Sequence, residues 1–334
     1  MPKKAQEKSP ESDNKKQAIE QVLAHIEKKY GEGVIARPGF VLDPINCIST
    51  GCPSLDYVLG GGFAKGRISE VFGAAGGGKS SIALRTVKCV QDADGLVVYI
   101  DMEHALNPRY VEDAGVSMGD MIISQPDTAE QCLNIVDQFI RSGGVDLIVI
   151  DSVASMMPEA ELKGDIGDSS IALVARLMSQ TLRRITAVTD KTKTHAMFIN
   201  QVRDNIGPYG GNKVTGGGQA LKFYSSQRLD VARVKTLMSG DKPTGHRVRV
   251  KVIKNKISTP FLTTELDLVY GEGISPMADY LNIGLRLGII TKRGGGWHSY
   301  GEESLGQGAL AALKTLSERP DIIEKINDAY LTTH

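Results

Sequence analysis

The chain has 334 residues, of which 41% are hydrophobic and 23% are charged, an ordinary composition for a globular protein with one large domain and appendages. Its 39 basic and 39 acidic residues cancel, so the net charge neither supports nor excludes a surface for nucleic acid. No run of about 18 apolar residues and no apolar core of a signal peptide occurs, which argues against a transmembrane helix and predicts a cytoplasmic protein.

The N-terminal region divides into a charged leader and an amphipathic helix. Residues 1–15 carry almost no apolar side chains, which predicts a disordered leader. Within residues 16–36, apolar side chains recur at helical spacing from Gln17 to Tyr30: Ile19, Val22, Leu23 and Ile26. A short helix followed by glycines cannot bury its apolar stripe alone. We expect it to pack on the main body or on another subunit.

The middle of the chain alternates between apolar strands and amphipathic helices. We expect strands at Arg67–Phe72, Leu96–Asp101, Val145–Asp151 and His195–Gln201, and helices at Ser80–Ala93, Ala129–Ser142 and Ser169 to about Val188. This alternation predicts an α/β fold with a mostly parallel central sheet covered by helices. Two further strands, Gln227–Val234 and His246–Asn255, follow each other without a helix between them. They are expected to add to one sheet edge in antiparallel fashion.

Two segments rich in glycine lack any periodicity, and the texture of the chain changes after about Ser275. The loops are Lys163–Ser170 and Arg203–Gln219, and loops of this kind in a compact domain are functional or disordered. Further on, the helical segments Met277–Leu287 and Gly308–Arg319 flank an expected hairpin near Gly294–Tyr300. We therefore predict a small α+β C-terminal domain over residues 276–334.

Four cysteines fall at spacings that match no zinc-binding pattern, and none forms a Cys-x-x-Cys pair: Cys47, Cys52, Cys89 and Cys132. Most of them lie in apolar or helical surroundings. Free thiols of a reducing compartment explain such a pattern better than metal ligands or disulfide bonds do.

A phosphate-binding motif carries the strongest chemical signal. Eight residues fit G-x-x-x-x-G-K-[ST]: Gly73, Ala74, Ala75, Gly76, Gly77, Gly78, Lys79 and Ser80. The motif follows a strand and opens a helix, a context that favours it over a plain glycine turn. Backbone amides of such a loop surround phosphate oxygens, Lys79 reaches the β- and γ-phosphates, and the Ser80 hydroxyl binds Mg²⁺. The motif predicts that the chain binds and hydrolyses a nucleoside triphosphate.

Polar residues at the ends of the other strands supply the remaining parts of an NTPase. Asp151 ends an apolar strand and is placed to hold Mg²⁺ through water. Glu103 follows another strand and is a candidate base for the attacking water, with Asp101 as its rival. Gln201 ends a third strand, where its amide is placed to sense the γ-phosphate. Ligands of open α/β sheets bind at this carboxyl edge.

Nine motifs, in order and spacing, give the chain a closer likeness: IEKKYGEG, ISTG-x-x-SLD, IDMEHALNPRY, SQPDTAEQ, IVIDSVA, INQVR, GGGQALKFY, KVIKNKI and YGEGI. From Gln17 to its C-terminus the chain resembles the bacterial RecA recombinase family. The resemblance implies a RecA-type ATPase core over residues 37–275, preceded by an arm, residues 16–36, that packs on an adjacent protomer.

For the nucleotide, the resemblance implies ATP with Mg²⁺ and divides the work between two subunits. Within one subunit Glu103 activates water, Gln201 senses the γ-phosphate and Lys79 completes the catalytic set. The remaining nucleotide contacts implied within that subunit are Ser81, Asn107, Tyr110, which stacks on the adenine, and Asp151. Lys254 and Lys256 are the residues that reach across a filament interface to the neighbour's ATP, and Phe223 lies at that interface.

For DNA, the resemblance identifies residues 163–170 and 203–219 as the first and second DNA-binding loops. The implied DNA contacts are Arg176, Ser179, Arg183, Arg203, Tyr209, Lys213, Thr215, Gly217, Gly218 and Gln219. Binding of single-stranded DNA needs neutralised phosphates and groups that stack on or insert between bases, which these segments offer. Departures from the family pattern include an Ala-Ala-Gly-Gly centre of the phosphate loop, Asn107 where Asp is usual, Tyr209 where Phe or Met is usual, and Lys213 where an acid is common.

The leading hypothesis is an ATP-dependent recombinase that polymerises on single-stranded DNA as a helical filament. It would pair that strand with homologous double-stranded DNA, exchange strands and hydrolyse ATP at subunit interfaces. The resemblance also suggests a repressor that is cleaved through contact with the filament. The alternative is a paralogue that binds ATP, does not exchange strands, and loads or modulates another recombinase. A hexameric helicase or clock-type ATPase is disfavoured by the loops and by the KNKI segment.

Overall fold

The computed structural model describes the chain except for residues 1–9, 32–33, 36–43, 166–171, 205–212 and 333–334, and it forms two compact units, Met1–Pro44 and Ile45–His334. The first unit holds one described helix, α1 (Pro10–Tyr30). It begins at Pro10, within residues 1–15, for which the sequence predicted a disordered leader. The proline and acidic residues at positions 10–13 favour a helix start. Along α1, Ile19 and Val22 are exposed.

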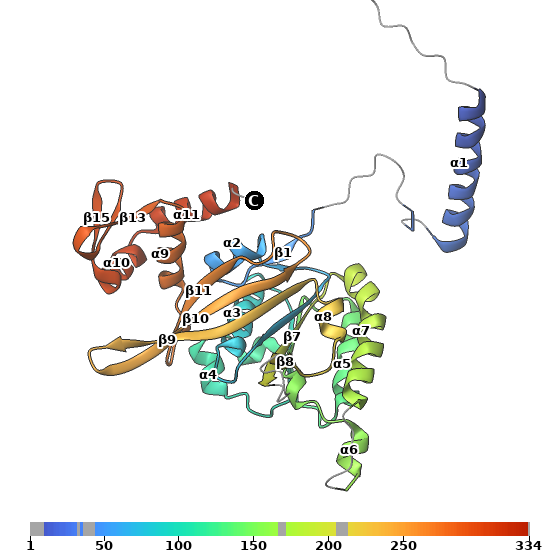
Figure 1. Cartoon of the computed structure of the whole chain (residues 1–334), viewed down its shortest axis with the longest axis horizontal. Coiled ribbons are helices and arrows are strands. Elements are labelled where there is room, and N and C mark those ends of the chain that lie inside the picture. The colour runs from blue at the N-terminus through green and yellow to red at the C-terminus, as the bar shows by residue number, and fades with distance from the viewer. Residues whose placement is uncertain (1–9, 32–33, 36–43, 166–171, 205–212, 333–334) are drawn as a thin grey trace, which may run out of the picture. The chain divides into compact units, whose positions relative to one another are not determined.

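Within the described residues the second unit contains a ten-stranded sheet (Figure 1). Its strands lie in the order β12 (Gly273–Ile274), β11 (Thr263–Val269), β10 (Lys242–Asn255), β9 (Gln227–Ser239), β3 (Ile68–Gly73), β7 (His195–Asp204), β6 (Leu147–Asp151), β4 (Val97–Asp101) and β5 (Met121–Ser124), with β8 (Lys213–Thr215) paired to β7. A separate antiparallel pair joins β1 (Cys47–Ile48) to β2 (Phe63–Ala64).

The direction of the strands confirms the mostly parallel sheet and corrects one prediction. Every neighbouring pair from β9 to β5 along the sheet is parallel. Strands β10, β11 and β12 add to the edge in antiparallel fashion. The segment from Gln227 was expected to be antiparallel, but β9 runs parallel to β3. The segment that contains the short helix α8 (Ala220–Tyr224) returns the chain to the end of the sheet at which β3 begins, so β9 starts beside the start of β3. A helix of this length is too short for hydrophobic periodicity to predict it.

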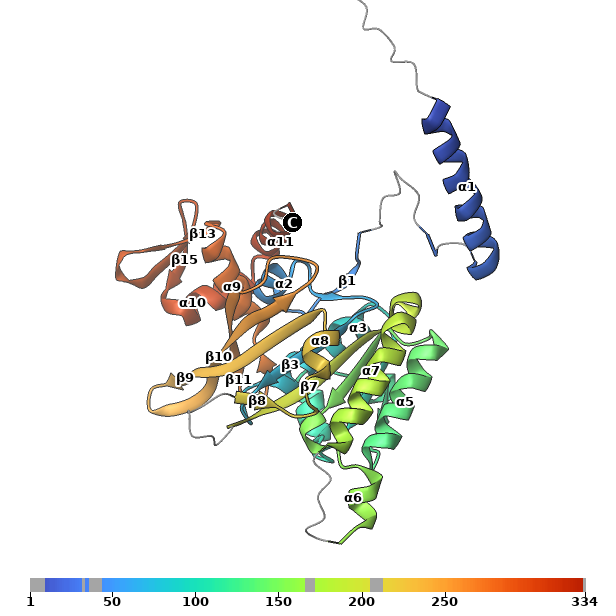
Figure 2. The same ribbon diagram turned by 45° about the vertical axis from the view of Figure 1, so that its right-hand side comes forward.

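Helices cover both faces of the parallel strands, because alternate side chains of each strand point to opposite faces. On β4, Val97 and Tyr99 join the core under α3 (Lys79–Asp92), whereas Val98 and Ile100 pack toward α5 (Ala129–Ser142) and α7 (Leu173–Thr192). Figure 2 shows α5 and α7 side by side on their face of the sheet. The remaining helices of this part are α2 (Pro53–Leu59), α4 (Pro108–Asp113), η1 (Met118–Asp120), η2 (Val153–Ser155) and α6 (Glu159–Lys163).

The C-terminal part contains the predicted hairpin and a core of its own. Its elements are α9 (Pro276–Arg286), β13 (Ile290–Arg293), η3 (Gly294–Gly296), β14 (Trp297–Tyr300), β15 (Glu303–Gln307), α10 (Gly308–Ser317) and α11 (Pro320–Thr332). Asp279 of α9 accepts the backbone N–H of Ser54 on α2 at 2.8 Å, and the Ser54 hydroxyl accepts a hydrogen bond from Thr264 at 2.8 Å. Burial raises the pKa of the Asp279 carboxyl to about 7. This buried cluster anchors the C-terminal part to the sheet.

All four cysteines are free thiols. Among the helices of the described residues, none combines the length and the apolar character that a membrane span requires.

A buried histidine at the start of β7 makes the stability of the fold depend on pH. His195 is fully buried, and its Nδ1 donates to the Ala64 carbonyl while its Nε2 accepts from the Ser69 hydroxyl, each at 2.8 Å. Burial lowers the pKa of His195 from 6.5 to about 4, although the bond to Ala64 opposes the shift. The unfolded chain therefore binds more protons than the folded chain between these two pH values. The contribution of the neutral His195 to the free energy of unfolding is fully present above pH 6.5 and is lost as the pH falls toward 4.

We expect this histidine to lower the free energy of unfolding by about 3 kcal/mol between about pH 7.5 and about pH 4. Urea unfolding at a series of pH values would measure the change for the wild type and for His195→Gln, whose amide can still donate to Ala64. Groups such as Asp279 are common to both proteins and cancel in the difference. The stability gap between wild type and variant should shrink as the pH falls. A gap that stays constant with pH would contradict the prediction.

Candidate active site

The phosphate-loop motif forms a tight turn between β3 and α3. A Cβ atom on Gly73 would lie 2.0 Å from the Val231 carbonyl oxygen, and Gly78 has a φ of 90°, so both positions require glycine. A Cβ atom on Gly76 would meet no described atom within 4 Å. The loop thus presents open backbone at the N-terminus of α3, an arrangement that binds anions.

Lys79 lies folded over this loop. Its Nζ donates to the Ala74 carbonyl oxygen at 2.8 Å. Burial lowers the pKa of the ammonium group, and the carboxylates of Asp151 and Glu103 oppose the shift. The ammonium group of Lys79 is bonded to a loop carbonyl and, among the described residues, is not paired directly with a carboxylate. Its side chain can therefore turn toward a phosphate bound in the loop. The donor set therefore fits a triphosphate.

Asp151 lies opposite the start of α3 and is held by two hydroxyl groups. Ser80 Oγ donates to Asp151 Oδ2 at 2.7 Å, and the Tyr99 hydroxyl donates to the same oxygen at 2.8 Å. Burial raises the pKa of the Asp151 carboxyl, and these two hydrogen bonds lower it. A hydroxyl oxygen next to a carboxylate is a donor set that suits Mg²⁺. The structure thus brings the two predicted metal residues together.

The structure separates Glu103 from its rival Asp101. The Asp101 carboxylate is buried and accepts the backbone N–H groups of Glu103 at 3.2 Å and Leu106 at 3.0 Å, together with Gln125 Nε2 at 3.0 Å. It therefore shapes the turn after β4. Glu103 is exposed, and its Oε1 accepts from Ser152 Oγ at 2.7 Å and from Gln201 Nε2 at 2.8 Å. Of the two carboxylates, Glu103 is the exposed one, which makes it the better placed to contact a water molecule.

A pocket of about 440 Å³ adjoins these groups. The predicted residues that line it are Ser80, Glu103, Asn107, Tyr110 and Asp151. Tyr110 shares a hydrogen bond of 2.5 Å with the hydroxyl of Ser81, which places that predicted residue next to the pocket. Asn107 Oδ1 accepts the Arg109 backbone N–H at 3.0 Å and caps α4. Residues that three separate motifs predicted to contact the nucleotide therefore converge on one pocket.

The predicted interface residues lie away from this pocket, near the end of α8: Lys254, Lys256 and Phe223. Lys254 Nζ donates to the carbonyl oxygens of Lys222 at 2.8 Å and Phe223 at 3.0 Å, at the end of α8. Burial lowers the pKa of Lys254, and the nearby charge of Lys256 adds to the effect. The Phe223 side chain is 71% exposed. These three residues therefore form one partly exposed corner.

Sheet register keeps this corner away from the phosphate loop of the same chain. Lys254 pairs with Arg228, which pairs with Glu70, three residues before the loop begins at Gly73. That separation is about 10 Å along the strands and about 10 Å across two strands. Asp151, on β6, lies four strands from β10, or about 19 Å. A lysine directed toward α8 does not span these distances to its own nucleotide site.

The predicted DNA residues are only partly described. Arg176 and Arg183 are exposed on α7, and Ser179 is half-buried between them at helical spacing. Thr215 is buried and Gln219 is exposed. Cβ atoms on Gly217 and Gly218 would lie 2.7 Å from Val153 Cγ1 and 2.8 Å from Ala175 Cβ, so both glycines are required where the second loop meets η2 and α7.

The two predicted DNA loops are described only at their ends. Lys163 ends α6, and most of the first loop lies outside the described residues. The second loop starts and ends in the β7–β8 pair, where Arg203 faces Val214 and Asp204 faces Lys213. Tyr209 lies outside the described residues, as do the side chains of Arg203 and Lys213. Strand β7 continues past Gln201 because β8 pairs with it.

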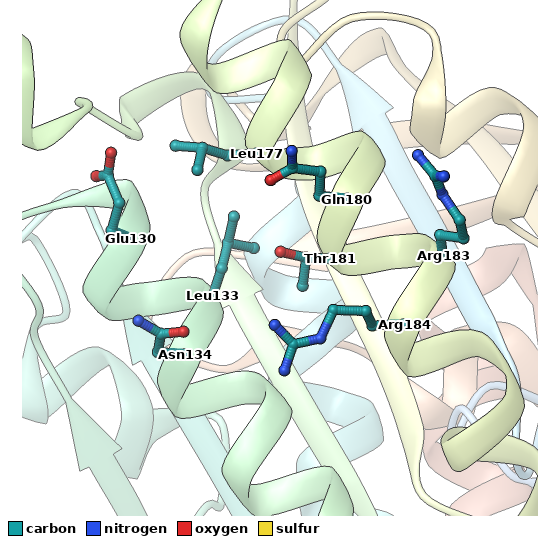
Figure 3. A pocket seen from close by; sticks show the side chains of 8 residues that line it. All are labelled: Glu130, Leu133, Asn134, Leu177, Gln180, Thr181, Arg183 and Arg184. Atoms are coloured by element: carbon teal, nitrogen blue, oxygen red, sulfur yellow. The ribbon is translucent and has the colours of Figure 1, made fainter.

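A pocket of about 470 Å³ between α5 and α7, which the sequence did not predict, includes Arg183 and Arg184 in its lining (Figure 3). In this view Arg184 reaches toward α5, and Arg183 leaves α7 on the other side. Arg184 is committed to an ion pair with Asp137 at 2.8 Å. Arg183 has no ion pair among the described residues, which leaves its guanidinium available for a phosphate.

Comparisons with known proteins agree with this geometry. The family model described as the RecA N-terminal domain matches residues 17–275, and that of the RecA C-terminal domain matches residues 278–331. A protein named Protein RecA from Saccharopolyspora erythraea is 48% identical over 316 residues, covering 94% of this chain and 91% of that protein. Protein RecA from Thermus thermophilus is 46% identical over 323 residues, covering 96% and 95%.

A more distant likeness concerns the fold alone. A solved structure described as the RadB recombinase superposes with a TM-score of 0.52 at 21% sequence identity, over 68% of this chain and 98% of that one. Because the two RecA models and the relatives cover nearly the whole chain at close to half identity, the assignment does not depend on any single motif. The chain belongs to the RecA family.

Proposed function

We propose that this chain is a DNA-dependent ATPase that assembles on single-stranded DNA as a helical filament and exchanges strands with homologous double-stranded DNA. The observation that carries the proposal is the separation of two half-sites on one chain. The phosphate loop, Glu103 and Gln201 lie at one end of the sheet. Lys254 and Lys256 lie on the other side of β3, too far to reach them. A second copy can supply the lysines, so hydrolysis belongs to an interface.

Within the first half-site each residue has a role that follows from its contacts. The phosphate loop binds the triphosphate, and Lys79 neutralises it. Ser80 and Asp151 would hold Mg²⁺, which when bound supplies charge neutralisation of the phosphates. Glu103 orients water and accepts its proton. Gln201 donates to Glu103, so a γ-phosphate that draws the Gln201 amide away would move the end of β7, from which the second DNA loop departs.

Coupling between nucleotide and DNA follows from this connection. If ATP favours one arrangement of β7 and its loop, and DNA binds that arrangement more tightly, ATP raises the affinity for DNA by the same factor as DNA raises the affinity for ATP. Hydrolysis then releases DNA. A cytoplasmic location and contact with a cleavable repressor accord with the family resemblance and belong to the same proposal.

Fluorescence anisotropy with labelled single-stranded DNA would test the proposal. We expect tight binding with a non-hydrolysable ATP analogue and Mg²⁺, weaker binding with ADP, and helical filaments in electron micrographs of the first sample. Affinity that does not depend on the nucleotide, or closed rings in the micrographs, would contradict it.

Mixing two inactive variants would test the shared site directly. Lys79→Ala lacks a working phosphate loop, and the double variant Lys254→Ala/Lys256→Ala lacks the donated lysines. In a head-to-tail assembly with random order, about one interface in four joins an intact loop to intact lysines. We therefore expect the mixture to regain about a quarter of the wild-type rate of phosphate release. Each variant alone is the control, and a mixture as inactive as its components would show that the lysines act within their own chain.

A further inference from the structure

The buried tyrosine of β4 contacts the carboxylate that is placed to hold the metal ion. Tyr99 is 1% exposed, and its hydroxyl donates to Asp151 Oδ2 at 2.8 Å. Ser80 Oγ donates to the same oxygen at 2.7 Å. We propose that Tyr99 is a positioning residue that fixes the Asp151 carboxylate so that its other oxygen faces the Mg²⁺ site. The inference rests on the proposed nucleotide function and adds a residue to it.

Strand register explains why a tyrosine reaches this carboxylate. On neighbouring parallel strands, Tyr99 pairs with Val149 and Asp101 pairs with Asp151. Tyr99, Val149 and Asp151 therefore point to the same face of the sheet, the face covered by α3. The target, Asp151, lies diagonally across, two residues beyond Val149 on β6, within reach of a long aromatic side chain. The ring fills the core under α3, and only the hydroxyl extends to Asp151.

The two donors to Asp151 Oδ2 are not equivalent. Ser80 is itself a proposed ligand of Mg²⁺, so its hydroxyl must turn toward the ion when the nucleotide binds. Tyr99 is buried and has no such second partner among the described residues. Its hydrogen bond is the one that can hold the Asp151 carboxylate in both states. Groups that orient a metal-binding side chain in this way typically change metal affinity by about 10- to 100-fold when removed.

Tyr99→Phe isolates the hydroxyl, because phenylalanine keeps the buried ring and its packing. The measurement is binding of a fluorescent, non-hydrolysable ATP analogue at increasing Mg²⁺ concentration. We expect the Mg²⁺ concentration at half-saturation to rise about tenfold in the variant. Binding of the analogue in EDTA should be the same in both proteins. Tyr300→Phe is the matched control, because it removes a tyrosine hydroxyl from β14, in the C-terminal part, and should leave the half-saturation unchanged.

The outcomes separate this inference from the proposed function. If the wild type itself shows no Mg²⁺-dependent binding of the analogue, the proposed function fails. If the wild type binds normally and Tyr99→Phe has the same half-saturation, the positioning role is overturned. Thermal unfolding without Mg²⁺ gives the second measurement. A lower Tm with unaltered half-saturation, or a variant that does not fold, would assign the hydroxyl to stability and would equally overturn the inference.

Discussion

Glu103→Gln is expected to slow ATP hydrolysis by about 10²- to 10⁴-fold, the range that a positioned general base contributes. The amide cannot accept a proton from water. It keeps the shape of the carboxylate, and its carbonyl oxygen can still accept from Ser152 Oγ and Gln201 Nε2, which lie 2.7 Å and 2.8 Å from Glu103 Oε1. Binding of ATP should therefore be retained. Phosphate release in the presence of single-stranded DNA measures the first effect, and binding of a fluorescent ATP analogue measures the second.

The matched control is Glu112→Gln, the same change at an exposed carboxylate on α4. It should hydrolyse ATP at the wild-type rate. Two results would count against the role of Glu103: a rate that does not change, or a loss of ATP affinity as large as the loss of rate. The second result would mean that Glu103 contributes to binding rather than to the chemical step.

The sequence could not decide whether Glu103 or Asp101 is the carboxylate that contacts water. Both carboxylates lie within three residues at the end of the same apolar strand, so spacing favours neither. They are separated only by the turn after β4, in which Asp101 accepts backbone N–H groups and Glu103 meets Gln201 of β7. The second contact joins residues 98 positions apart. Local sequence patterns do not predict a contact between residues so far apart in the chain.

Elements set by local chemistry were predicted closely. Helix α5 covers the expected Ala129–Ser142, since Thr128 caps its start by accepting the Gln131 N–H and Gly143 ends it at a φ of 69°. The predicted direction of β9 was wrong, because the direction of a strand depends on whether the preceding connection crosses from one end of the sheet to the other. Tyr99 was not identified as a functional residue for a related reason. In an apolar strand its ring fits the pattern of the core, and its hydroxyl acquires a role only from the neighbouring strand.

A second large effect is expected from an ion pair that no motif indicated. Glu70 on β3 is fully buried, and its Oε2 accepts from Arg228 Nε of β9 at 2.6 Å. Its Oε1 accepts from Asn200 Nδ2 of β7 at 3.0 Å, and Asn200 also donates to the Gly216 carbonyl, which lies within the predicted second DNA loop. The Arg228 guanidinium lies 4.7 Å from the ring of Phe72. One carboxylate thus joins three adjacent strands.

Arg228→Leu should lower the free energy of unfolding by about 3–5 kcal/mol, because it leaves the Glu70 carboxylate charged and buried without its cation. The double variant Glu70→Gln/Arg228→Leu should recover much of that loss, since the amide introduced on β3 can still accept from Asn200 and no uncompensated charge remains. Urea unfolding of the wild type, both single variants and the double variant gives the coupling between the two positions. Lys163→Met, which removes an exposed partner of Glu159, is the control and should change stability by less than about 1 kcal/mol.

The double variant also separates stability from coupling. Arg228 stands in register between Glu70 and Lys254, and Asn200 precedes Gln201, the proposed γ-phosphate sensor, and accepts its backbone N–H at 3.0 Å. If the ion pair only stabilises the sheet, a folded double variant should bind single-stranded DNA with the wild-type dependence on ATP. The pair could also hold β7, which carries Gln201, in place relative to β10, which carries Lys254. In that case the double variant should show a smaller difference than the wild type between its DNA affinity with the ATP analogue and its DNA affinity with ADP. We expect the narrowing, because Glu70 is bonded both to Asn200 of β7 and to Arg228 of β9, the strand that pairs with β10 and Lys254. An unchanged difference in a well-folded double variant would limit its role to the core.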